Sequence, residues 1–159
     1  PQDCKQKILI KPPTIIHPIK DLTKVIQKLQ PKIDPVTAKE IAKAVEKYSQ
    51  KYNFPPELII AIINQESTFK PLSISSANCI GLMQINKKMH MEKLTKLNIK
   101  GAAIFHIDNN IHVGCIILKE YHDNTKTISG ALQKYLGANN KEYLLAILSS
   151  FADLIINQK

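Results

Sequence analysis

The stretch that decides the fold is an apolar run, Pro55-Pro56-Glu57-Leu58-Ile59-Ile60-Ala61-Ile62-Ile63-Asn64-Gln65-Glu66, followed after a loop by Gly81-Leu82-Met83-Gln84-Ile85-Asn86. Proline is tolerated in the first turn of a helix and a carboxylate suits its positive end, so the run predicts a helix that starts at its prolines. Its isoleucines and leucines leave almost no polar face, which is typical of a buried helix. Glu66 is therefore expected near the C-terminal end of a buried helix.

This position bears on the chemistry of Glu66. Burial and the negative end of a helix both disfavour a charged carboxylate, and both should raise the pKa of Glu66. A carboxyl group that holds its proton near neutral pH can act as a general acid. On the helix argument alone, a solvated glutamate at a helix end is the favoured interpretation.

The residues that follow change this balance. Glu66-Ser67-x-Phe69-x-Pro71, then Ser75, then Gly81-Leu82-Met83-Gln84-Ile85, resemble the signature of the lytic transglycosylase family with the goose-type-lysozyme-like fold. The chain departs from that signature at Asn78-Cys79, where the family usually has Gly-Ala, and at Ser73, where it usually has Ala. Asparagine tolerates left-handed backbone, so Asn78 is expected to replace a turn glycine.

The resemblance also implies the roles of individual residues. Glu66 would be the catalytic residue, and the expected substrate-binding residues are Ser75, Met83, Gln84, Asn110 and Tyr135. Ser75 matches a serine whose hydroxyl contacts the substrate's N-acetyl group, and Gln84, with amide donors and an acceptor, would line the saccharide cleft. Tyr135 corresponds to a tyrosine whose hydroxyl lies near the catalytic glutamate, although Leu136 stands where the family often has asparagine.

The rest of the chain reads as helices. Asp21 and Asp34 are expected to cap helices over residues 22–30 and 35–52. Two further helices are expected over residues 87–97 and 143–151. Another helix is expected to start after Asp108, with Asp108 as its cap. Gly114 inside a helix costs about 1 kcal/mol relative to alanine, so close packing against the Gly81 region is expected. The predicted fold is mainly α and lysozyme-like, with an N-terminal arm or accessory segment at 1–33 and the catalytic domain at 34–159.

Composition narrows the function classes. The chain has 159 residues and a formal net charge of +9, but its lysines are scattered and it lacks tryptophan, which argues against a nucleic-acid module. The charge would instead assist docking on anionic wall polymers. No apolar run is long enough for a transmembrane helix and no signal peptide is visible, which fits a processed chain and leaves export open.

Histidine and cysteine spacing indicates neither a metal site nor a cofactor, because no HxxxH, HExxH or CxxC pattern occurs. Three cysteines are present, at positions 4, 79 and 115. A disulfide between Cys79 and Cys115 is one hypothesis in an oxidising compartment, and free thiols are the other.

The predicted function is that of a peptidoglycan lytic transglycosylase, an enzyme of the periplasm or cell envelope. It would cleave the β-1,4 bond between N-acetylmuramic acid and N-acetylglucosamine and form a 1,6-anhydro ring, with Glu66 as acid and then base. Its partners would be glycan strands, and the sequence resembles small transglycosylases of secretion and conjugation complexes. Two alternatives stay open: a hydrolytic muramidase on the same fold, and a non-catalytic wall-binding assembly subunit.

Overall fold

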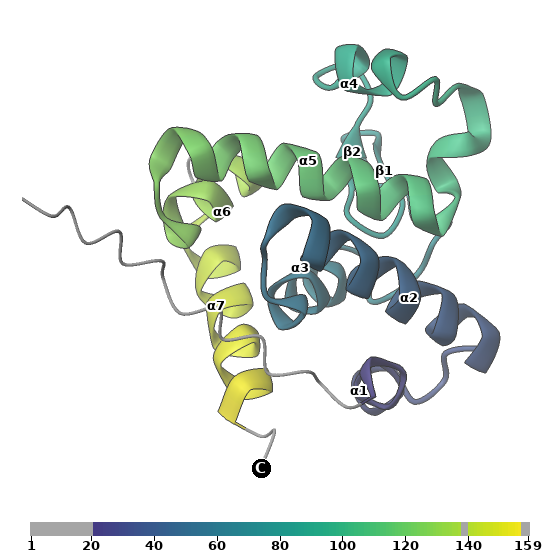
Figure 1. Ribbon diagram of the computed structural model, residues 1–159, viewed down its shortest axis with the longest axis vertical. Coiled ribbons are helices and arrows are strands. Elements are labelled where there is room, and N and C mark those ends of the chain that lie inside the picture. The colour runs from purple at the N-terminus through teal and green to yellow at the C-terminus, as the bar shows by residue number, and fades with distance from the viewer. Residues whose placement is uncertain (1–20, 138–139, 157–159) are drawn as a thin grey trace, which may run out of the picture.

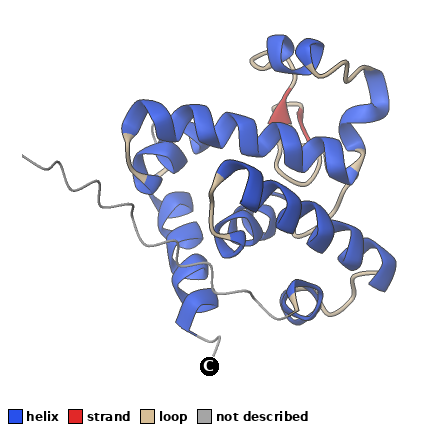
Figure 2. Ribbon diagram, in the orientation of Figure 1, coloured by secondary structure: helices blue, strands red, loops and turns tan. Residues whose placement is uncertain are grey.

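Helices make up most of the molecule (Figures 1 and 2). The computed structural model describes residues 21–137 and 140–156. In this part of the chain the elements are α1 Leu22–Leu29, α2 Pro35–Tyr52, α3 Pro56–Ser67, β1 Cys79–Ile80, β2 Ile85–Asn86, α4 Met91–Lys96, the 3-10 helix η1 Gly101–Phe105, α5 Ile107–Thr125, α6 Ile128–Leu136 and α7 Lys141–Ile156. The predicted mainly-α, lysozyme-like fold is confirmed.

Local capping chemistry sets the ends of the first helices. The Asp21 side chain accepts a hydrogen bond from the Lys24 N–H at the start of α1, and Asp34 accepts one from the Thr37 N–H, 2.8 Å away, at the start of α2. Asn53 ends α2 in the left-handed conformation with φ of 56°. All three ends agree with the sequence prediction, because caps depend only on neighbouring residues.

Helix α3 is the centre of the core. Every residue from Leu58 to Ile63 is fully buried, as predicted from the absence of a polar face. Helices α2 and α7 pack against α3, and α5 packs across α2 and α6 (Figure 1). The chain leaves α3 through two consecutive left-handed residues, Thr68 and Phe69, and the buried Phe69 ring returns the chain to the core.

A short hairpin follows the loop after α3. Strand β1 pairs antiparallel with β2, with Cys79 opposite Asn86 and Ile80 opposite Ile85. These strands were not predicted, because two residues each are too few to show an alternating pattern. The hairpin is the only sheet in the described residues, and it lies beside α5 in Figure 1.

Two local predictions are wrong. Asp108 does not cap α5, because the helix begins one residue earlier with His106 at the N-cap, and the Asp108 carboxylate instead bonds to α2. The helix expected over 87–97 is shorter, because only the six residues of α4 are helical. The residues before α4 form turns, in which the side-chain oxygen of Asn86 accepts hydrogen bonds from the N–H groups of Lys88 and Met89.

The N-terminal segment is described only from residue 21. Helix α1 packs against α2, and Ile26 in it is fully buried. The predicted division at residue 34 stays a prediction, and residues 1–20 lie outside the described range. Within the described ranges, no helix is both long and apolar enough to cross a bilayer.

Candidate active site

Glu66 lies in the last turn of α3, as predicted, and its side chain is half-buried. Burial raises the pKa of its carboxyl group from an ordinary 4.5 to about 7. Within residues 21–137 and 140–156, Glu66 forms no ion pair that would oppose this shift. Glu66 can therefore be protonated or ionised at neutral pH, and either state is accessible without a large free-energy cost.

Two tyrosines lie close enough to Glu66 to sense its charge. The pKa of Tyr135, on α6, is raised well above its usual value by burial and then by the charge of Glu66. The pKa of Tyr143, on α7, is raised by burial and then by the same charge. The Tyr135 hydroxyl donates to the Met83 carbonyl oxygen over 2.8 Å, and the Tyr143 hydroxyl donates to the Gln65 carbonyl oxygen over 2.8 Å.

Asn110 fixes the hairpin whose Met83 carbonyl oxygen accepts from Tyr135. Its Oδ1 accepts from the Met83 N–H at 2.8 Å, and its Nδ2 donates to the carbonyl oxygens of Ile80 and Ile104 at 2.9 and 3.0 Å. The side chain is fully buried. Asn110 thus joins α5 to the hairpin and to η1 through backbone groups that would otherwise be buried without partners.

Two glycines make this close approach possible. A Cβ at Gly81 would lie 2.2 Å from Asn110 Nδ2, and Gly81 also has φ of +78°. A Cβ at Gly114 would lie 2.3 Å from the sulfur of Met83. The close packing predicted for Gly114 against the Gly81 region is confirmed, and it explains why a helix-weakening residue stands in the middle of α5.

The loop before the hairpin carries the other predicted site residues. The Ser75 hydroxyl accepts from the Cys79 N–H at 3.1 Å, and the Ser75 N–H donates to the Cys79 carbonyl oxygen at 3.0 Å. Asn78 is left-handed with φ of 58°, as predicted for a residue that replaces a turn glycine. Gln84 also has a positive φ, and its Nε2 donates to the Gly81 carbonyl oxygen at 3.0 Å.

These contacts divide the predicted site residues into two groups. Ser75, Gln84 and Tyr135 have partly exposed side chains on the loop, the hairpin and α6, and substrate contact by them stays a prediction. Met83 and Asn110 are completely buried, and Asn110 supports the hairpin through its bonds to the Met83 N–H and the Ile80 carbonyl oxygen. Substrate contact by these two residues stays a prediction as well.

The two described cysteines are free thiols. Cys79 is half-buried at the start of β1, and Cys115 is buried in α5. Burial raises the pKa of the Cys115 thiol to about 12. The structure thus contradicts the hypothesis of a Cys79–Cys115 disulfide and agrees with the free-thiol alternative for this pair.

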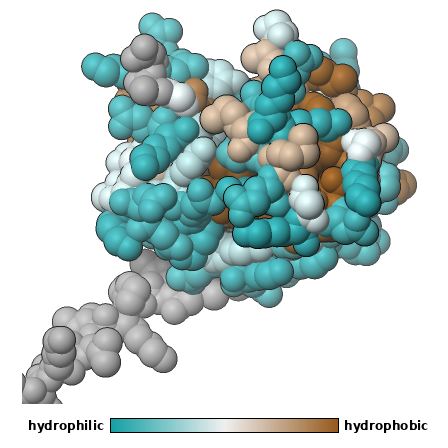
Figure 3. Space-filling model, turned by 90° about the horizontal axis from the view of Figure 1, so that it is seen from above, coloured by the Kyte–Doolittle hydropathy of each residue, from teal (hydrophilic) through white to brown (hydrophobic). Residues whose placement is uncertain are grey.

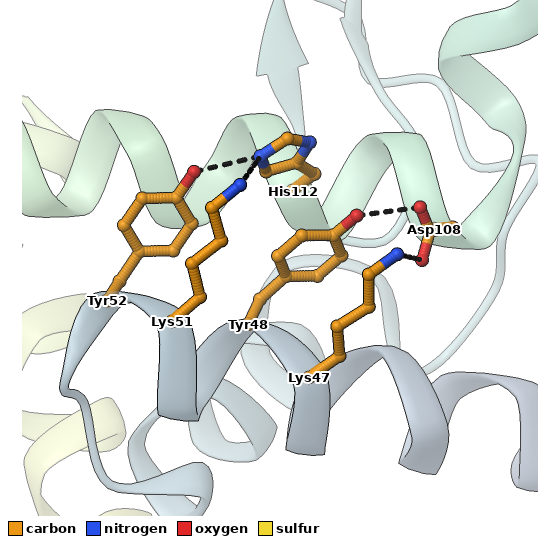
Figure 4. A network of polar contacts seen from close by, with 6 residues as sticks. All are labelled: Lys47, Tyr48, Lys51, Tyr52, Asp108 and His112. Carbon is orange, nitrogen blue, oxygen red and sulfur yellow. Dashed lines mark hydrogen bonds and ion pairs between the residues drawn. The ribbon is translucent and has the colours of Figure 1, made fainter.

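A polar network that was not predicted from the sequence joins α2 to α5 (Figure 4). Asp108 accepts from the Tyr48 hydroxyl at 2.7 Å and from Lys47 Nζ at 2.8 Å. One turn further along, the Tyr52 hydroxyl lies 2.8 Å from His112 Nε2. Tyr48 and Tyr52 are four residues apart in α2, and Asp108 and His112 are four residues apart in α5. This spacing places each pair on one side of its helix, and it was the only sign of the network in the sequence.

This network also affects His112. The His112 ring stacks on Tyr48 with centroids 4.4 Å apart, and its pKa is lowered by burial and then by the charge of Lys51. A neutral ring can accept a hydrogen bond from the Tyr52 hydroxyl at Nε2. The network joins α2 to α5, the helix that presents Asn110 to the hairpin.

Apolar side chains also reach the surface around the loop and the hairpin. The large hydrophobic residues with more than half of their surface exposed include Leu72, Ile74, Met89 and Met91, all within segment 72–91. Figure 3 shows the molecule of Figure 1 from above, from the end where α4 lies. Hydrophobic residues gather on one part of this face. Apolar surface beside a few polar groups is typical of ligand sites.

Comparison with known proteins agrees with these observations. Membrane-bound lytic murein transglycosylase C of Sodalis glossinidius (strain morsitans) is 34% identical over 79 residues, which cover 46% of this chain and 22% of that protein. The proteins of the same name from Actinobacillus pleuropneumoniae serotype 5b (strain L20) and Haemophilus influenzae (strain PittEE) are each 42% identical over 50 residues, which cover 31% of this chain and 14% of theirs. The chain thus matches less than a quarter of the length of these curated relatives.

The family model described as Transglycosylase SLT domain matches residues 43–146. The match begins inside α2 and ends inside α7, so it includes Glu66, the loop, the hairpin and both tyrosines. Because this match extends over more than half of the sequence, the chain belongs to the transglycosylase SLT domain family.

Proposed function

We propose that this protein is a peptidoglycan lytic transglycosylase that uses Glu66 as its only catalytic carboxyl group. The observation that carries the proposal is the position of Glu66: a half-buried carboxyl, without an ion pair in the described residues, whose pKa is about 7 in a chain of the SLT family. A group that transfers a proton in both directions works best when its pKa lies near the working pH.

The proposed reaction has two proton transfers at Glu66. The protonated carboxyl first gives its proton to the glycosidic oxygen between N-acetylmuramic acid and N-acetylglucosamine, and the C1–O bond breaks. The acetamido group of the muramic residue stabilises the cation that develops at C1. The Glu66 carboxylate then takes the proton of the muramic 6-hydroxyl, whose oxygen bonds to C1 and closes the 1,6-anhydro ring.

Most glycosidases use two carboxyl groups, and one of them serves to form a covalent intermediate or to activate water. In the proposed reaction, neither role is needed, because the substrate supplies the acetamido group and the nucleophilic hydroxyl. The mechanism is therefore compatible with a single acid, and it ends with Glu66 protonated again for the next cycle.

The surrounding residues have distinct proposed roles. Ser75 and Gln84 would bind the sugar acetamido and hydroxyl groups, since hydroxyl and amide side chains offer both donors and acceptors. Tyr135 would form one wall of the site beside Glu66, and its hydroxyl donates a hydrogen bond to the Met83 carbonyl oxygen. Met83 and Asn110 would keep the hairpin at a fixed position against α5.

We place the protein in the cell envelope, where its substrate is found. The relatives named above are membrane-bound murein transglycosylases, and the net charge of +9 would favour anionic wall polymers over neutral ones. A role within a secretion or conjugation complex, or elsewhere in the periplasm, rests on the sequence resemblance alone.

Product analysis tests the proposal. Purified peptidoglycan is digested with the protein and with Glu66→Gln, and the released muropeptides are identified by mass spectrometry. The expected result is 1,6-anhydromuramic ends with the unmodified protein and none with Glu66→Gln. Reducing ends would instead indicate a hydrolase, and retained wall binding without products would indicate a binding subunit.

A further inference from the structure

The end of α3 depends on hydrogen bonds from distant parts of the chain. The last carbonyl groups of a helix lack intrahelical partners and need other donors. The Asn64 carbonyl oxygen accepts from the Thr68 N–H at 3.0 Å, which closes the last turn locally. The next carbonyl, that of Gln65, accepts from the Tyr143 hydroxyl, and the carbonyl of Thr68 accepts from Gln30 Nε2 at 3.3 Å.

These two donors come from opposite ends of the sequence. Tyr143 lies in the first turn of α7, which packs against α3, and it is 78 residues after Gln65. Gln30 is the C-cap of α1, lies 38 residues before Thr68, and is outside residues 43–146 that match the family model. Fully buried Ile26 holds α1 against the core. The donors therefore approach the backbone just before and just after Glu66.

We propose that Tyr143 and Gln30 are positioning residues for Glu66: they hold the backbone on both sides of it and so fix where its carboxyl group lies. The inference rests on the proposed function, because it assumes that Glu66 transfers the proton. It also gives α1, within the segment expected to be an accessory arm, a direct structural link to the proposed catalytic residue.

The physical reason is the sensitivity of proton transfer to position. A general acid must lie within hydrogen-bond reach of the oxygen that it protonates, and a misplacement of about 1 Å can cost two orders of magnitude in rate. If the Gln65 carbonyl loses the Tyr143 hydroxyl, water is expected to take its place beside Glu66. Because burial is the cause of the raised pKa of Glu66, added water should lower that pKa.

The titratable tyrosines near Glu66 should not change charge while Glu66 titrates. The charge of Glu66 contributes to the pKa values of Tyr135 on α6 and Tyr143 on α7. Both pKa values are raised, so both phenols are neutral over the range in which Glu66 titrates. A change in the titration of Glu66 would therefore report its surroundings.

The first experiment compares Tyr143→Phe with Tyr52→Phe in the full chain. Tyr143→Phe keeps the ring and removes only the hydroxyl that bonds to Gln65. Tyr52→Phe is the matched control, because it removes a partly buried hydroxyl that bonds to His112. The titration of Glu66 is followed by carbon-13 NMR of its carboxyl group, assigned by comparison with Glu66→Gln, and kcat and KM are measured on peptidoglycan.

With Tyr143→Phe, the pKa of Glu66 is expected to fall from about 7 toward 4.5. The expected kcat falls about three- to tenfold, the size of one lost hydrogen bond, while KM changes less than about twofold. Tyr52→Phe should leave the titration of Glu66 unchanged. An unaltered titration in folded Tyr143→Phe would overturn the role of Tyr143.

The second pair tests the N-terminal donor. Gln30→Met keeps the length of the side chain and removes its donor, and Gln27→Met makes the same change at a half-buried position on α1. A smaller shift in the same direction is expected for Gln30→Met alone, because its bond at 3.3 Å is longer. A shift with Gln30→Met that Gln27→Met does not show would support positioning, and no difference between Gln30→Met and Gln27→Met would overturn the role of Gln30.

The two readouts separate this inference from the proposed function. If the unmodified protein yields no anhydro products, the proposed reaction fails even when the titration of Glu66 responds to Tyr143→Phe. If products form normally and the titration does not respond, the positioning inference fails alone. Should Tyr143→Phe not fold, as judged by circular dichroism, the Gln30 and Gln27 pair decides.

Discussion

Replacing Glu66 with glutamine should stabilise the fold above neutral pH, although it removes the proposed catalytic group. The pKa of Glu66 is about 7 in the folded protein, against an ordinary value of 4.5. Each pKa unit corresponds to about 1.36 kcal/mol, so keeping this group ionised in the folded state costs up to about 3 kcal/mol. Glutamine has a similar shape and no charge, so the cost disappears.

The sign follows from the proton balance. Between pH 4.5 and about 7 the unfolded chain loses the Glu66 proton while the folded protein keeps it. The folded state then binds more protons, so the contribution of Glu66 to stability falls as pH rises through this window and stays low above it. Below pH 4.5 the group is protonated in both states, and Glu66→Gln should differ little from the unmodified protein.

Urea denaturation at pH 4 and pH 8 measures the effect. The stability difference between Glu66→Gln and the unmodified protein is expected to be about 2 to 3 kcal/mol larger at pH 8 than at pH 4. Glu142→Gln, at an exposed position on α7, is the control for the chemical change itself. The same difference at both pH values would refute the idea that burial holds Glu66 protonated.

Three further predictions concern the support of the site. Gly114→Ala should destabilise the protein by up to about 2 kcal/mol in urea denaturation, because overpacking against Met83 at about 1–3 kcal/mol outweighs a helix-propensity gain of about 1 kcal/mol. Asn110→Ala should cost about 3–5 kcal/mol by the same measurement, because an N–H and two carbonyl groups lose buried partners. Asp108→Ala should cost only about 1 kcal/mol, with little change between low and high salt, because its ion pair to Lys47 is exposed and the neutral hydroxyl bond contributes most.

Each of these predictions has an outcome that contradicts it. For Gly114→Ala, the companion Met83→Ala should relieve the overlap, and additive effects in the double mutant would show that the two residues do not interact. A loss below about 1 kcal/mol for Asn110→Ala would mean that water replaces its bonds. Strong salt dependence for Asp108→Ala would assign the stabilisation to the ion pair with Lys47.

Local chemistry explains which parts of the fold could be predicted. Asp34 and Asn53 mark the ends of α2 through their own side chains and backbone preferences, so the sequence around them was sufficient. Gly114 indicated close packing, because a glycine inside a helix is less stable than alanine and is expected only where a larger side chain would not fit. Glu66 could be predicted because it ends an apolar helix and begins the family signature. The predicted rise in its pKa agrees with the structure.

The parts that could not be predicted depend on partners far away in the sequence. Asp108 looked like a helix cap, but its carboxylate bonds to Lys47 and Tyr48, about sixty residues earlier. Tyr143 was expected only as part of a helix over 143–151, because nothing near it in sequence indicates the Gln65 carbonyl. Asn110 resembled a substrate ligand by its motif, and only the fold shows that its amide bonds to three backbone groups.

The source of the oxygen at the cleaved end tests the central claim most directly. Peptidoglycan is digested with the protein in oxygen-18 water, and the new muramic ends are weighed by mass spectrometry. If Glu66 acts as acid and then base on the substrate's own hydroxyl, the new ends should be anhydro forms that contain no oxygen-18. New ends that carry one oxygen-18 atom would show that water attacks C1, and the single-carboxyl transglycosylase account would be contradicted.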